Sequence, residues 1–122
     1  MKGITSFTLN ADAGYDSGLS MELKDLQRVQ AEHDEKFHKD MMSWDKGKQI
    51  EHCSFHLNKL AGLFSTYCEK MHHGEKYEVD KLVSDRIPDL LIFALKFANL
   101  FDVDLENSYK DRLRAVEARR KF

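Results

Sequence analysis

The fold is decided by residues 89–106, which read DLLIFALKFANLFDVDLE. The first part of this stretch, 89–101, is apolar on nearly every side of a helix, a pattern typical of helices in the interior of a protein. A short connection follows, and Asp104 stands where an N-cap residue begins the next helix. The apolar side of that last helix repeats at helical spacing through Leu105, Tyr109, Leu113 and Val116. We therefore expect a buried helix followed by an amphipathic one.

Two further amphipathic helices are predicted before this stretch. Apolar residues recur at spacings of three and four over 19–41, where Ser20 is the expected cap. The same spacing returns over 48–72, and the polar segment 43–47 separates the two helices. Each of these helices is expected to bury one face against the rest of the domain.

Pro88 complicates the start of the third helix, because proline lacks an amide donor and clashes with the preceding turn. We expect the regular part after Asp85, as a kinked continuation of a segment that begins near Asp80. Residues 1–18 mix Gly, Ser, Thr and Asn without a helical period, which predicts a flexible or loosely docked tail. The prediction is an all-α domain over 19–122, built from four antiparallel helices with short connections.

The composition excludes several classes of function. The chain has 122 residues, which suits one domain, and its 19 Lys and Arg against 21 Asp and Glu give a net charge of −2. This balance excludes bulk electrostatic attraction to nucleic acid or to a membrane surface as the main function. No apolar run approaches the roughly 18 residues needed to cross a bilayer. Neither nucleic acid nor a membrane is therefore expected as a partner.

Cys53 and Cys68 fall on the apolar stripe of one predicted helix. At about 1.5 Å per residue they lie roughly 22 Å apart, too far for a disulfide within the chain. We expect inert core thiols in a reducing compartment, and hence a cytoplasmic protein.

The stretch 89–106 also resembles the MazG-like, all-α nucleoside triphosphate pyrophosphohydrolases. The shared order is an acid, an apolar helix, Ala98-Asn99, a short turn, and then Asp104-Leu105-Glu106 at the start of a helix rich in Lys and Arg. The resemblance extends to 56–63, with Gly62, and covers 19–120. It implies nucleotide-binding roles for Trp44, in the loop before the second helix, and for the basic Arg119.

Members of that family hydrolyse nucleoside triphosphates to the monophosphate and pyrophosphate, using Mg²⁺ held by carboxylates of two adjacent helices. Mg²⁺ prefers hard oxygen ligands, bridges phosphate oxygens and orients a water for attack. The resemblance therefore implies Mg²⁺ as cofactor and Asp89 as one of its ligands. Asp85 lies four residues earlier, so both carboxylates can share a helical face and hold one ion.

This chain departs from the family at three of four expected carboxylates. Leu60 and Leu63 stand where the first Glu pair is expected, and Arg86 stands where the next Glu is expected. A guanidinium cannot ligate Mg²⁺, and the leucines favour packing over a wet metal site. The alternative for the surviving acids is that Asp85 caps a helix while Asp89 pairs with Arg86 or a lysine.

His52 and His56 offer a different metal site, because imidazoles four residues apart on a helix can reach one ion. The alternative is that both rings border a core stripe or line a pocket. If the second and third helices pair in the family's register, His56 faces Phe93 and not Asp85.

Three hypotheses for function follow. The first is a MazG-related nucleotide-binding protein with a degenerate pyrophosphohydrolase site and weak or absent hydrolysis. The second is an active Mg²⁺-dependent enzyme with a rearranged site of Asp85, Asp89 and a further acid such as Glu69. The third is a structural or partner-binding helical oligomer. A homo-oligomer is expected in any case, because the apolar third helix exceeds what one four-helix layer hides.

Overall fold

The computed structural model describes residues 21–120, and this part of the chain consists of helices and their connections, with no strand. The predicted tail at 1–18 and the predicted domain start at 19 lie outside the described residues. The elements are α2 (Leu23–Phe37), α3 (Lys39–Met42), α4 (Lys46–His72), α5 (Val79–Lys81), the π-helical turn η3 (Leu82–Arg86), α6 (Ile87–Leu100) and α7 (Leu105–Ala118). The predicted all-α class is confirmed.

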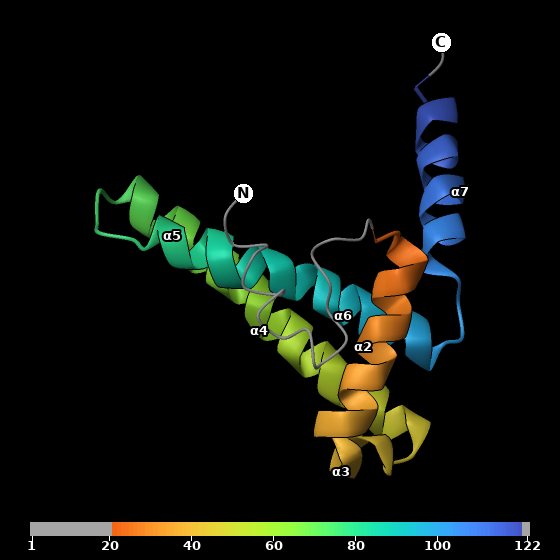
Figure 1. Ribbon diagram of the computed structural model, residues 1–122. Coiled ribbons are helices and arrows are strands. Elements are labelled where there is room, and N and C mark those ends of the chain that lie inside the picture. Colours follow the sequence, from red (N-terminus) through yellow and green to blue (C-terminus); the bar gives the residue numbers. More distant parts are fainter. Residues whose placement is uncertain (1–20, 121–122) are drawn as a thin grey trace.

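A long antiparallel hairpin dominates the architecture. Its arms are α4 and the run α5, η3 and α6, which lie side by side in Figure 1. Helix α2 packs across α6 near one end of the hairpin, and α7 contacts α2 before it extends away from the other helices. The far end of the hairpin, where α4 turns into α5, projects away from α2 and α7 (Figure 1). The four long helices expected from the sequence are present, and their MazG-like arrangement stays a prediction.

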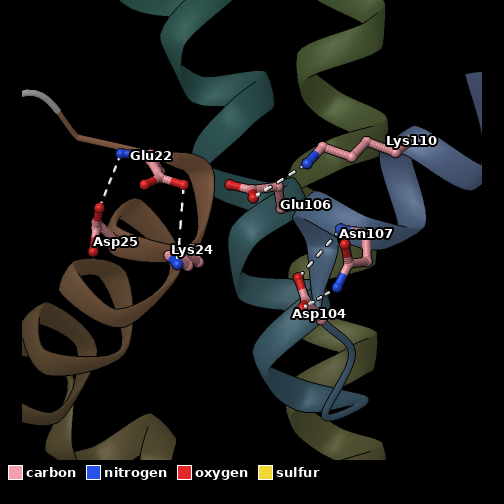
Figure 2. A network of polar contacts seen from close by, with 7 residues as sticks. All are labelled: Glu22, Lys24, Asp25, Asp104, Glu106, Asn107 and Lys110. Carbon is pink, nitrogen blue, oxygen red and sulfur yellow. Dashed lines mark hydrogen bonds and ion pairs between the residues drawn. The ribbon is translucent and has the colours of Figure 1, made fainter.

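Side-chain caps fix where the helices begin. Asp104 caps α7 as predicted, because its Oδ1 accepts from the Asn107 amide at 3.2 Å (Figure 2). Asp45 caps α4 through the Lys48 amide at 2.8 Å, so this helix begins two residues before the predicted Lys48. A carboxylate at a helix N-terminus satisfies an amide that lacks an intrahelical partner.

The first predicted helix, 19–41, differs from the structure at both ends. Helix α2 begins at Leu23 and not near Ser20, because the Asp25 carboxylate accepts from the Glu22 amide at 2.9 Å and sets the N-cap there (Figure 2). The helix stops at His38, whose φ of −129° and ψ of 41° break the helical backbone. Met41, the last apolar position of the predicted helix, lies on the single turn α3.

Pro88 is accommodated as predicted, within a continuous helical run from 79 to 100. Proline removes one backbone donor, and the π-helical turn η3 directly before it absorbs the disturbance. Asp85 lies inside this turn, so the interpretation of Asp85 as a helix cap is wrong.

The core lies where α2, α4 and α6 meet. Its buried apolar residues, among the described ones, are Val29, Cys53, Leu60, Leu95 and Ala98. Helix α6 was expected in the interior, and this holds for only one of its sides. Ile87 is 49% exposed and Leu90 and Leu91 are each 41% exposed, because no other element of the described chain covers that side.

A buried ion pair joins α2 to α6. Lys96 Nζ donates to Asp34 Oδ1 at 2.7 Å, and the two side chains are only 12% and 8% exposed. Gln30 Nε2 donates to the same oxygen at 3.1 Å. This pair is not predictable from the sequence, since its partners come from helices far apart in the chain.

Breaking this pair is expected to destabilise the fold. Asp34→Ala leaves the buried Lys96 ammonium without its counter-charge, so we expect the free energy of unfolding to fall by about 3 kcal/mol. Asp34→Leu combined with Lys96→Met is expected to recover most of that loss, because apolar residues can replace a buried pair. Urea unfolding followed by circular dichroism measures both.

The matched control is the exposed pair of Arg28 and Glu32 on α2. Removing it with Glu32→Ala is expected to cost less than about 0.5 kcal/mol. Equal losses in Asp34→Ala and Glu32→Ala would contradict the structural role of the buried pair.

Candidate functional site

The two acids implied as magnesium ligands have other partners. Asp89 Oδ2 lies 3.6 Å from Arg86 Nη1, which is the predicted alternative for this residue. Asp85 Oδ1 accepts from the Ser84 hydroxyl at 2.8 Å. Within residues 21–120, no three His, Cys, Asp or Glu side chains are grouped so that they could hold a metal ion.

The two residues implied to contact nucleotide lie at separate ends of the molecule. Trp44 precedes α4, where Lys48 Nζ stands 4.2 Å from its ring centroid and the His52 ring lies 5.4 Å away. Arg119 is the C-cap of α7. The start of α4 and the end of α7 are at opposite sides of the view in Figure 1, so these side chains do not form one site.

Cationic and aromatic side chains gather at the far end of the hairpin. A cavity of about 630 Å³ opens there between the last turns of α4 and the run of α5 and η3. We call it the tip cavity. Its lining combines four cationic and two phenolic side chains: Lys70, Lys76, Lys81, Arg86, Tyr67 and Tyr77.

The turn between the hairpin arms brings the second half of this lining back over α4. Gly74 adopts a φ of +69°, a left-handed conformation that glycine accommodates without strain. The Glu75 amide donates to the Lys70 carbonyl at 2.8 Å and the Gly74 amide to the Met71 carbonyl at 3.2 Å. These two bonds form a Schellman motif, which ends α4 and directs the following residues towards it. Tyr77 thereby meets Tyr67, with ring centroids 4.9 Å apart and planes at 88°.

The charge of the tip cavity is strongly positive. Lys70, Lys76 and Lys81 form no ion pair with other residues of the described chain, and Glu78 is the one carboxylate in the lining. Unpaired ammonium groups and an arginine suit phosphate or carboxylate oxygens, and tyrosine rings suit a planar aromatic group. The arrangement can therefore bind an aromatic anion.

The tip cavity lies beside the positions at which this chain departs from the MazG pattern. Leu63, on α4, and Arg86, on η3, both line it, and Leu60 is buried one turn before Leu63. From the sequence alone these residues are losses of metal ligands, with no visible connection to the lysines. The cluster Lys70, Lys76 and Lys81 around a glycine turn was the available signal.

His52 and His56, on α4, pack in a row of aromatic rings. His56 stacks on Phe93, as the predicted register of the two helices requires, with centroids 5.7 Å apart and planes at 12°. The His52 ring lies 4.5 Å from that of His56. Burial lowers the pKa of His52, and the neighbouring His56 lowers it further. These contacts favour a packing role, in which the neutral ring is preferred.

The two cysteines differ in environment. Cys53 is 2% exposed, and burial raises the pKa of its thiol, so it matches the predicted inert core thiol. Cys68 is exposed, and the prediction of a second core thiol is wrong, because helical spacing shows which side is apolar but not whether that side is covered. Both are free.

Comparison with known protein families, curated proteins and solved structures finds no match to this chain. None of the helices formed by residues 21–120 is long and apolar enough to span a bilayer.

Acid is expected to destabilise the fold through its half-buried histidines. Burial lowers the pKa values of His33 and His52 below the 6.5 of a free side chain, so the unfolded chain takes up protons first as the pH falls. The free energy of unfolding is expected to be constant above about pH 7.5 and to decrease below about pH 6.5. Urea unfolding over this pH range measures the slope.

His52→Asn is expected to flatten that slope, because the variant lacks one of the groups that titrate differently in the two states. The control is His72→Asn, at the exposed end of α4. An unchanged slope in His52→Asn would show that this histidine does not couple protonation to folding.

Proposed function

We propose that this protein is a divergent relative of the MazG-like enzymes that binds nucleotides at the tip cavity, with weak or absent hydrolysis. The observation that carries the proposal is the lining of that cavity by four cations and two tyrosine rings. Phosphates are recognised by Lys and Arg, and nucleobases stack on aromatic side chains. The proposed nucleotide site is therefore the hairpin tip, and not Trp44 or Arg119.

The weak hydrolysis follows from the side chains beside the cavity. Pyrophosphate release in the family needs carboxylates that hold Mg²⁺ and a water aligned by it. Leu60 and Leu63 carry no ligand atom, and Asp89 pairs with Arg86. A single carboxylate that is also shared with a guanidinium binds Mg²⁺ poorly.

Charge reversal in the tip cavity is expected to weaken nucleotide binding. Lys70→Glu combined with Lys81→Glu replaces two attractive groups with repulsive ones, so we expect at least a tenfold rise in the Kd for a nucleoside triphosphate. The matched control is Lys59→Glu, on the exposed side of the same helix α4. Isothermal titration calorimetry gives the dissociation constants, and thermal unfolding confirms that each variant is folded.

Pyrophosphate release from a panel of nucleoside triphosphates with Mg²⁺ or Mn²⁺ separates binding from catalysis. The proposal predicts binding with weak or no turnover. Turnover that Asp89→Ala abolishes would contradict it and would establish the second hypothesis, an enzyme rearranged around Asp85 and Asp89.

An oligomer is a second candidate, and a specific surface favours it. Val83, Ile87, Leu90 and Leu91 recur at spacings of four, three and one, so they form one stripe along η3 and α6. All four are at least 40% exposed. A stripe of this kind packs well against the same stripe of a second copy about a two-fold axis.

Leu91→Glu is expected to shift the protein from dimer to monomer, because it places a charge in the apolar stripe. Sedimentation equilibrium measures the mass of each form. Phe55→Glu, on a different and exposed side of α4, is the control and is expected to leave the mass unchanged. A monomeric wild-type chain at micromolar concentration would refute the homo-oligomer.

A further inference from the structure

We infer that the tip cavity binds the phosphate chain directly through its lysines and Arg86, so that the free nucleoside triphosphate, and not its magnesium complex, is the preferred ligand. This inference rests on the proposed function. It goes further because it assigns the task of the metal ion to cationic side chains, among them Arg86, which stands where the resemblance predicts a Glu.

Positive charge predominates in the lining of the tip cavity. Four cations line it, whereas Glu78 is the one carboxylate of the lining. A free triphosphate carries more negative charge than its magnesium complex, so it gains more from a site of this sign. A site for the magnesium complex needs carboxylate oxygens near the metal ion. Within residues 21–120, no three His, Cys, Asp or Glu side chains are grouped so that they could hold one.

The cations reach the tip cavity from both arms of the hairpin. Lys70 comes from the end of α4, Lys76 from the connection, and Lys81 and Arg86 from α5 and η3. A phosphate chain entering between the hairpin arms meets cations from both arms. Divalent metal ions perform the same task in other phosphate sites by bridging several phosphate oxygens at once.

Arg86 has hydrogen-bond donors that its ion pair with Asp89 does not use. Its side chain is 33% exposed, and its Nη1 stands 3.6 Å from the Asp89 carboxylate, beyond a close hydrogen bond. The guanidinium therefore retains donors for a ligand in the cavity. Arginine presents them as a planar fork that matches two phosphate oxygens.

The tyrosines supply affinity for the base but little selectivity. Tyr67 and Tyr77 meet edge to face, and Tyr77 is 40% exposed, so part of its ring is open to a ligand. Every nucleobase offers a π face to such a ring. Selection is therefore expected to follow the number of phosphates, in the order triphosphate, diphosphate, monophosphate.

The test is calorimetric titration of the full-length protein with one nucleoside triphosphate, in EDTA and in excess MgCl₂, at equal ionic strength set with NaCl. The inference predicts binding in EDTA and at least a threefold higher Kd with MgCl₂. It also predicts at least a tenfold higher Kd for the monophosphate in EDTA. Inorganic tripolyphosphate is expected to compete for the same site.

The outcomes separate the inference from the proposed function. Binding that requires MgCl₂ would overturn the inference and leave nucleotide binding intact. Binding of tripolyphosphate with the same affinity as the nucleotide would support the metal-free anion site and overturn the nucleotide function. Absence of binding by either ligand in both buffers would overturn both.

Two variants locate the effect within the cavity. Arg86→Lys keeps the charge but loses the planar fork, and it is expected to weaken triphosphate binding in EDTA at least threefold. Tyr77→Ala is expected to weaken binding of the nucleotide but not of tripolyphosphate, since only the nucleotide has a base to stack. Lys59→Ala is the control, and an equal loss in this variant would assign the binding to general surface charge and overturn the inference.

Discussion

The ion pair of Lys96 and Asp34 is the contact on which the packing of α2 against the hairpin depends. Both charges are almost fully buried, with nitrogen and oxygen 2.7 Å apart. Separating them would leave an unpaired charge in an apolar surrounding, which fixes one relative position of α2 and α6. Gln27 extends the connection, because its amide nitrogen donates to the Val103 carbonyl at 2.6 Å and its oxygen accepts from the Leu105 amide at 3.1 Å. The start of α7 is tied to α2 in this way.

The proposed function uses the end of the molecule that this core does not reach. The ion pair, Cys53 and Leu95 lie where α2 covers the hairpin, whereas the tip cavity lies beyond that cover. A hairpin tip free of other helices exposes its lysines to solvent and leaves them without carboxylate partners. Unpaired positive charge of this kind attracts anions, and the leucines beside it carry no ligand atom for a metal ion.

The sequence contained enough local information to predict most of the helices. The Asp104 cap and the continuation of the helix past Pro88 depend on nearby residues, and both are confirmed. His56 faces Phe93, as expected from the register of the two helices. Periodicity shows which side of a helix is apolar but not whether another element covers it, so the exposure of Leu90 and Cys68 was missed. The ion pair and the tip cavity join residues that only the folded hairpin brings together.

The central claim is that the cationic hairpin tip is where phosphates bind, and backbone NMR of the ¹⁵N-labelled protein during titration with a nucleoside triphosphate tests it most directly. The account predicts that the largest changes in amide shift fall on the residues around Lys70, Tyr77 and Arg86, with little change near Trp44 or Arg119. Changes centred on Trp44, or none above those caused by an equal concentration of chloride salt, would contradict it.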